Sequence, residues 1–361
     1  MPDVALSKTI KVLLFFFLVF AGLYFAREFL IPIAFGGILA TLVLPFSRRL
    51  ESKGLHKGLA AVLSIVCLLL IAAIVAGLLI WQVSDLAADL SGIQKQVSGI
   101  LDKVERFLAT TAGIPQDSQK ELLKQQSQGG GGVTKFLGGL MGFLVDSVLV
   151  TVYTFLFIYF RGRIKKFILR LVPAEEIDRT EKVIGQSTQV AYQYLSGLLM
   201  MIVMLWILYG IGFSVAGLKS ALFFAVLCGL LEIVPFVGNL TGTSIAILMA
   251  VSQGEGSGLI IGVILTYFLV QFLQTYIIEP LVVGSEVNIN PLFTILVLVL
   301  GEILWGIAGM ILAIPLLGIT KIVCDNIEPL KPYGYLIGDD SKPGKSSGIS
   351  NKIKSLFKKN N

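Results

Sequence analysis

The chain has 361 residues, of which 55% are hydrophobic and 14% are charged, and its formal net charge is +6. This composition excludes an ordinary soluble domain, in which about a quarter of the residues are charged. The apolar residues form runs of about 18 or more, long enough to cross ~30 Å of hydrocarbon as helices, and they lack the period-two alternation of a membrane barrel. We therefore predict an all-α polytopic membrane protein with about eight hydrophobic segments.

Three membrane spans are predicted in residues 1–81, at about 10–29, 31–47 and 58–81. The first of these resembles a secretory signal. Its apolar core is too long for one, however, and no small-residue cleavage site follows, so we predict a retained helix. We expect Glu28 and Pro32 to mark a tight turn between the first two spans.

Residues 82–135 are polar and form a predicted extracytoplasmic region that ends in the Gly129–Gly132 tract, a flexible tether. Apolar residues between 83 and 107 recur at alternating spacings of three and four. They are Val83, Leu86, Leu90, Ile93, Val97, Ile100, Val104 and Phe107. This pattern is typical of a coiled-coil seam. The helix either packs on its own chain or joins copies of the chain into a homo-oligomer.

Residues 136–191 are predicted to hold a fourth span, at about 136–160, a basic cluster at 161–170, and a charged amphipathic helix at 174–191. We expect the amphipathic helix to lie on or near the membrane surface. A fifth span, at about 192–213, opens the predicted transport core, residues 192–325.

Two segments of this core, 219–252 and 292–325, are each 34 residues long. A straight helix of that length would reach ~51 Å, too long for the bilayer. Both contain helix breakers near the middle, and an apolar helix at about 258–279 separates them. Each is therefore either a pair of plain spans or a re-entrant hairpin, and the sequence leaves both alternatives open.

Lys and Arg cluster at the N-terminus, at 48–57, at 161–170 and in the tail, residues 326–361. Since cytoplasmic loops carry an excess of basic residues, we predict a multi-pass protein of a bacterial cytoplasmic (inner) membrane with both termini in the cytoplasm. The tail ends in a basic amphipathic segment suited to an anionic lipid surface, or is a disordered solubilising tail. Because the basic residues lie at membrane edges, no nucleic-acid partner is expected.

Residues 220–320 contain five glutamates and no Lys, Arg, His or Asp. A charged side chain at the bilayer centre costs about 2.5–3.5 kcal/mol, so such a carboxylate must bind a cation, take a proton or face water. Glu232, Glu279 and Glu302 lie beside Pro or Gly, where a helix opens and exposes carbonyls at membrane depth. Secondary transporters bind ions and substrates at such breaks.

The predicted substrate or ion site gathers these carboxylates and nearby amides: Glu232, Asn239, Gln274, Glu279, Asn288, Asn290 and Glu302. The helix breaks around it are Pro235, Gly238, Pro280, Gly301, Gly306 and Gly309. A plainer alternative is that Glu279 and Glu286 cap helices at the membrane surface. The sequence has no paired-cysteine metal motif, no nucleotide site and no enzyme signature, so Na⁺ or H⁺ is the expected coupling ion and no cofactor is predicted.

Short motifs of this chain occur in a distinctive order. They are Leu30-Ile-Pro32, Leu44-Pro45, Pro235-Phe-Val-Gly238, Glu279-Pro-Leu-Val-Val-Gly284, Asn290-Pro291, Gly306-Ile-Ala-Gly309 and Ala313-Ile-Pro315. In these the chain resembles the autoinducer-2 exporter family of bacterial membrane proteins. The resemblance implies a permease with about eight segments. Members are described as exporters of autoinducer-2, and some as Na⁺(Li⁺)/H⁺ antiporters. Residues 82–135 do not share it.

The sequence thus favours a gradient-driven secondary transporter over an enzyme. Its partner would be a small polar solute such as autoinducer-2, or a cation exchanged as Na⁺ or Li⁺ for H⁺. The alternative is a non-transporting membrane scaffold or assembly factor, for which the coiled-coil seam and the basic tail would provide contacts.

Overall fold

The computed structural model describes residues 2–88, 132–234, 237–254, 256–282 and 289–339. These residues are helical apart from short turns and one isolated bridge between Ile289 and Gly338. Six helices in the described ranges are long and apolar enough to cross a membrane, and three more are apolar but shorter. The predicted class, an all-α polytopic membrane protein, is confirmed.

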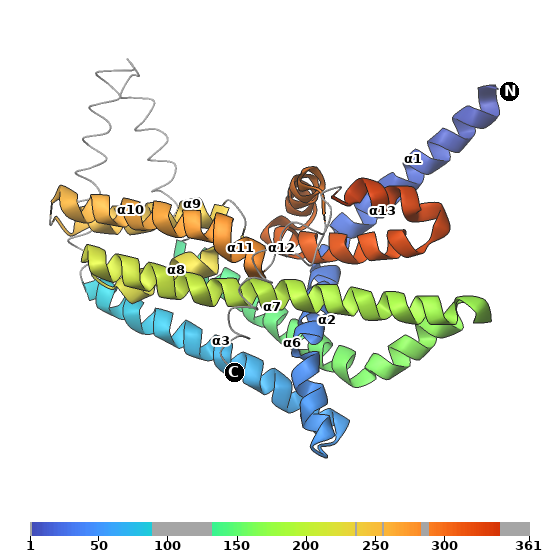
Figure 1. The fold of residues 1–361 in the computed structure, drawn as a ribbon, viewed down its shortest axis with the longest axis horizontal. Helices are drawn as coiled ribbons and strands as arrows, with labels where there is room; N and C mark the ends of the chain where they lie inside the picture. Colours follow the sequence, from blue (N-terminus) through green and yellow to red (C-terminus); the bar gives the residue numbers. More distant parts are fainter. Residues whose placement is uncertain (1, 89–131, 235–236, 255, 283–288, 340–361) are drawn as a thin grey trace, which may run out of the picture. The chain divides into compact units, whose positions relative to one another are not determined.

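The helices follow one another along the chain as Figure 1 labels them. Their bounds are α1 Pro2–Phe25, α2 Arg27–Ser52, α3 Lys57–Ala88, α6 Gly132–Arg170, α7 Ile177–Ala216, α8 Ala221–Leu231, α9 Val237–Ser252, α10 Ser257–Leu273, α11 Glu279–Val282, α12 Pro291–Asn326 and α13 Lys331–Ile337. A π-helical segment, Gln274–Ile278, joins α10 to α11, and short 3-10 turns, Ala174–Glu176 and Glu328–Leu330, precede α7 and α13.

The chain divides into two compact units. Unit 1 comprises Met1–Pro45, Ile158–Met201 and Thr275–Asn361. Unit 2 comprises Phe46–Phe157 and Ile202–Gln274. The predicted transport core is therefore divided, since α8, α9 and α10 belong to unit 2 and α12 to unit 1.

The break between the first two helices lies at Ala26 and not, as predicted, at Glu28 and Pro32. Both of those residues lie inside α2. Glu28 occupies the first turn of α2, where a carboxylate complements the positive end of the helix dipole. The Pro32 side chain is fully buried, and its packing accounts for a proline in this helix.

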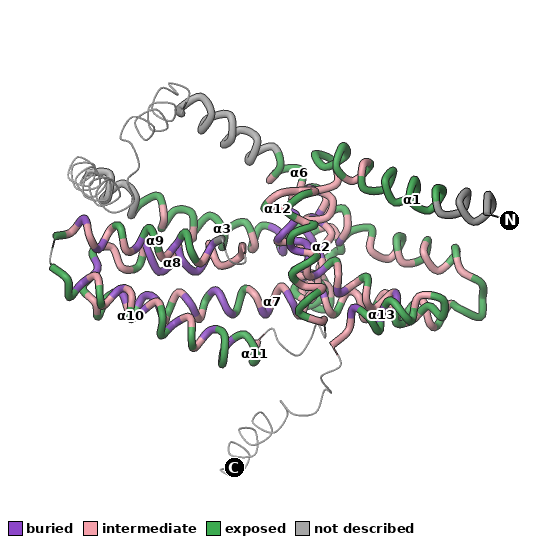
Figure 2. Tube along the Cα trace, turned by 90° about the horizontal axis from the view of Figure 1, so that it is seen from above, coloured by how far each residue is buried: buried purple, intermediate pink, exposed green. Residues whose placement is uncertain are grey.

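The predicted boundary between a helix at 174–191 and the fifth span is wrong, and the placement of 174–191 at the membrane surface remains a prediction. Those residues continue into the fifth span as one helix, α7, because no proline interrupts residues 177–216 and a helix without a breaker propagates. The buried residues of α7 recur every three or four positions, from Ala191 through Tyr209 to Phe213, and form the stripe visible along it in Figure 2. Large apolar side chains such as Ile207 and Ile211 are exposed on its other face, as expected for contact with lipid.

Residues 221–234 and 237–252 form a helical hairpin, which we call hairpin 1. Its legs are α8 and α9, and α9 packs against both α8 and α10 (Figure 1). The reversal depends on Gly238, since a Cβ atom there would overlap the Leu231 carbonyl group. The legs have 11 and 16 residues, about 16 and 24 Å, and each is shorter than the ~30 Å hydrocarbon layer. This geometry favours the re-entrant hairpin over two plain spans.

Residues 291–326 form hairpin 2, although they are a single helix by hydrogen bonding. Gly306 has φ 60° and ψ −141°, which is non-helical and strained for any residue with a Cβ atom. The Gly301 and Gly309 backbones touch, since a Cβ atom on Gly301 would lie 2.6 Å from the Gly309 carbonyl oxygen. Residues eight positions apart in a straight helix are separated by about 12 Å. The chain therefore turns back on itself at Gly306.

A strap formed by residues 327–339 closes the base of hairpin 2. At the start of the hairpin, the backbone N–H of Asn290 donates to the Ile337 backbone carbonyl at 2.9 Å. At its end, Gly334 of α13 packs directly on Asp325. Lys331 donates a hydrogen bond to the exposed carboxylate of Glu328 and lowers the pKa of that carboxylate. The contact therefore stabilises the strap at a pH above the ordinary glutamate pKa, and this stabilisation is lost as the pH falls through the lowered pKa of Glu328.

Gly334→Val should loosen this strap. A Cβ atom on Gly334 would overlap the Asp325 carboxylate and lie 3.0 Å from the Asp325 backbone nitrogen, so α13 must move away. Overpacking of this kind costs about 1–3 kcal/mol, and we expect thermal unfolding in detergent at a lower temperature than in the wild type. Gly185→Val is the matched control, because no heavy atom lies within 4 Å of a Cβ atom placed there. An equal effect of both substitutions would contradict the packing role of Gly334.

The predicted coiled-coil seam lies almost entirely outside the described residues, since α3 is described to Ala88 and α6 from Gly132. The homo-oligomer therefore remains a prediction. Leu90→Lys combined with Val97→Lys should dissociate it, because charges at seam positions oppose burial. The measurement is the mass of the detergent-solubilised protein by light scattering. An unchanged mass would reject the seam as the contact.

Candidate functional site

Glu232 ends the first leg of hairpin 1. Its backbone N–H donates to the Cys228 carbonyl, so its side chain leaves the helix at the point where the chain turns. The Gln274 Nε2 atom donates a hydrogen bond of 2.7 Å to Glu232 Oε1. Gln274 is 4% exposed. One partner of this carboxylate is thus a buried amide 42 positions further along the chain.

The second leg of hairpin 1 makes a parallel contact with α10. Asn239, in the first turn of α9, donates from Nδ2 to the Gln271 Oε1 atom. Gln271, in the last turn of α10, and Gln274, the first residue after it, are three positions apart and therefore lie on the same face. That face carries one amide for each leg, so the C-terminal end of α10 binds hairpin 1 at its turn through two polar contacts.

The π-helical segment that begins at Gln274 has a local cause. Pro280 lacks an N–H group and its ring clashes with the carbonyl four residues earlier, that of Tyr276, so the preceding turn widens. The irregularity was expected at Glu279-Pro280 and is found just before it, over Gln274–Ile278. Gln274 therefore lies where the regular α-helix ends.

Two buried oxygen atoms of this cluster, Gln274 Oε1 and Asn239 Oδ1, have no hydrogen-bond partner among the described residues. A buried acceptor without a donor is costly, so it marks a place where a water molecule, a proton or a cation fits. Together with the Glu232 carboxylate they form an acceptor-rich cluster. Oxygen ligands of this kind suit hard cations.

The other predicted site residues lie elsewhere. Glu279 is the exposed first residue of α11, and Glu302 is exposed near the turn of hairpin 2. The Asn290 side chain caps α12 by accepting from the Leu292 N–H at 2.9 Å, so helix capping accounts for it without a ligand. Asn288, Glu286 and Pro235 lie outside the described residues. The structure thus brings together Glu232, Asn239 and Gln274, and it adds Gln271, which is not among the predicted site residues.

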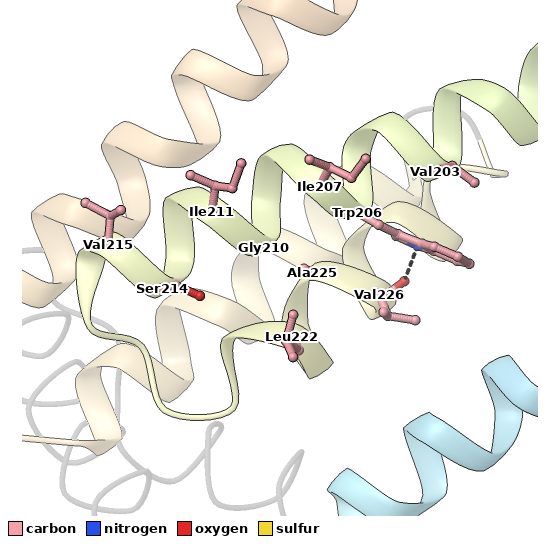
Figure 3. A pocket seen from close by; sticks show the side chains of 10 residues that line it. All are labelled: Val203, Trp206, Ile207, Gly210, Ile211, Ser214, Val215, Leu222, Ala225 and Val226. Atoms are coloured by element: carbon pink, nitrogen blue, oxygen red, sulfur yellow. Dashed lines mark hydrogen bonds between the residues drawn. The ribbon is translucent and has the colours of Figure 1, made fainter.

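An open apolar groove of about 620 Å³ runs between α7 and α8 (Figure 3). Trp206 lies in it and donates from Nε1 to the Val226 carbonyl at 3.1 Å. Its ring packs on Gly229, where a Cβ atom would overlap the ring. This contact fixes the first leg of hairpin 1 to α7. Its only signal in the sequence is an aromatic residue within an apolar run.

Comparison with known proteins points to one family. Its profile, described as AI-2E family transporter, matches residues 13–328. "Putative transport protein YrrI" of Bacillus subtilis (strain 168) is 25% identical over 307 residues, 82% of this chain and 86% of that protein. "Putative transport protein YueF" of the same strain is 26% identical over 322 residues, 85% of this chain and 86% of that protein. "Putative permease PerM" of Escherichia coli (strain K12) is 25% identical over 322 residues, 84% of this chain and 89% of that protein.

The apolar helices and the matching family profile define the class as a polytopic membrane protein of a transporter family. The chain belongs to the AI-2E transporter family. This confirms the resemblance drawn from the ordered motifs. The bacterial relatives support a multi-pass protein of the inner membrane, and the orientation of the termini remains a prediction.

Proposed function

We propose that this protein is a gradient-driven secondary transporter in which Glu232 is the coupling carboxylate. It exports a small polar molecule, such as autoinducer-2, or exchanges Na⁺ or Li⁺ for H⁺. Family membership supports transport, and relatives named as transport proteins and as a permease support it further. The substrate and the coupling ion are part of the proposal.

One observation carries the proposal. Glu232 binds the buried amide of Gln274 at 2.7 Å, and amide oxygens beside it lack donors among the described residues. A carboxylate held by a neutral donor can alternate between a protonated form and a cation-bound form, since a proton or a cation each neutralises it at membrane depth. The site lies where hairpin 1 turns, and helix breaks of this kind hold the ligands of secondary transporters.

The direct test is flux into proteoliposomes. An imposed pH or cation gradient should drive Na⁺, Li⁺ or a small polar metabolite into liposomes that contain the reconstituted protein. Empty liposomes should show no such flux. Collapsing the gradient with an ionophore should stop the flux. No flux for any of these solutes, together with co-purification of a fixed protein partner, would overturn the proposal in favour of a membrane scaffold or assembly factor.

A further inference from the structure

The turn of hairpin 2 is attached to the first helix. Trp305 is half-buried, and its Nε1 atom donates to the Leu23 carbonyl oxygen at 2.9 Å, across 282 positions of sequence. Both residues belong to unit 1, in which α1 and α12 pack together. Leu23 lies in the last turn of α1, where carbonyls have no donor within their own helix. The indole therefore satisfies a carbonyl that the break at Ala26 leaves open.

Trp305 is also the residue before the turn. Gly306, with φ 60°, follows it directly, and Glu302 precedes it by three positions on the same face of the first leg. The Gly301 and Gly309 backbones touch on either side of this turn, so the two legs of hairpin 2 meet directly before and after it. Fixing the indole on α1 therefore fixes the segment that carries the Glu302 carboxylate.

We infer that Trp305 is a positioning residue that latches the Glu302-bearing tip of hairpin 2 to α1, and that the tip moves only when this hydrogen bond breaks. An indole N–H and a carbonyl left without partners in a water-poor environment are both costly. The tip thus has two discrete arrangements, latched and released. In the released arrangement, the indole N–H and the Leu23 carbonyl each need a new hydrogen-bond partner. The functional part of this inference rests on the proposed transport function, since a moving tip would open a path for solute.

The test is a distance measurement between spin labels at Val19→Cys on α1 and Ile307→Cys beyond the turn, in a Cys67→Ala background. Both positions are exposed, while Cys228 and Cys324 are buried. Trp305→Phe keeps an aromatic ring and removes the donor. We expect the population at longer distance to rise about two- to ten-fold, the change that corresponds to a hydrogen bond of about 0.5–1.5 kcal/mol.

Trp81→Phe is the matched control, because Trp81 is 64% exposed on α3, and it should leave the distances unchanged. Replacing Trp305 by benzothienylalanine keeps the shape and removes only the N–H, so it separates loss of the bond from loss of packing. It should reproduce the effect of Trp305→Phe. Wild-type distances in both Trp305 variants would overturn the latch.

This readout is independent of flux. If the protein transports nothing but the Trp305 variants show a larger population at the longer spin-label distance, the proposed function is contradicted and the latch is supported. A protein that transports normally and shows unchanged distances in these variants would keep the function and sink the latch.

Discussion

Glu232→Gln should reduce gradient-driven flux about ten- to hundred-fold, because it replaces a charged group, whose hydrogen bonds are worth about 1.5–3 kcal/mol, by a neutral one. The amide has nearly the shape of the carboxylate, but it neither takes a proton nor neutralises a cation. Gln274→Leu should also reduce flux, because it removes the donor that binds Glu232 at 2.7 Å. Initial flux into proteoliposomes measures both effects.

Glu175→Gln is the control for charge alone, since Glu175 is exposed in the turn before α7. It should transport at the wild-type rate. If Glu232 and Gln274 act as one unit, the double variant should lose less than the sum of the two single losses, expressed as free energies. Normal flux in Glu232→Gln would reject Glu232 as the coupling group, whatever the other variants show.

Gly309→Ala should disrupt hairpin 2 and, with it, transport. A Cβ atom on Gly309 would overlap the Gly301 carbonyl group, and backbone has no rotamer by which to move aside. Overpacking costs about 1–3 kcal/mol, so we expect a lower thermal midpoint in detergent and a loss of flux beyond the fall in folded protein. Both are measured on the same purified sample.

Gly77→Ala is the matched control, because Gly77 is also helical and has open space around it. Alanine is about 1 kcal/mol more favourable than glycine within a helix, so this variant should be as stable as the wild type or slightly more stable. Equal stability of the two alanine variants would show that the two legs of hairpin 2 are not in contact at Gly301 and Gly309.

Much of the fold could be predicted because its causes are local. The length of each apolar run determines whether a helix can cross the bilayer, and Pro and Gly determine where it opens. These rules correctly predict the break at Gly306, whereas Gly238 lies in the first turn of α9, directly after the reversal of hairpin 1. They fail at residues 174–191 because a change from charged to apolar side chains does not end a helix, and α7 continues through it.

The sequence could predict which residues belong to the polar cluster, but not which of them contact one another. The sequence marks Glu232 and Gln274 as polar groups near helix breaks, and it marks Glu302 in the same way. Nothing in their spacing shows that Glu232 meets Gln274, 42 positions away, while Glu302 belongs to unit 1. Asn290 also has the character of a ligand, although its side chain caps α12.

The amino-acid sequence alone determined that the chain consists of membrane helices, that several of them break at Pro or Gly, and which family it resembles. Each of these depends on hydrophobicity and backbone freedom within a single segment. The tertiary structure decided that both long segments turn back as hairpins, that Gln271 and Gln274 each supply an amide to one leg of the first, and that Trp305 binds α1. Such contacts join residues 32 to 282 positions apart, and periodicity within one helix carries no information about which distant helix will pack against it.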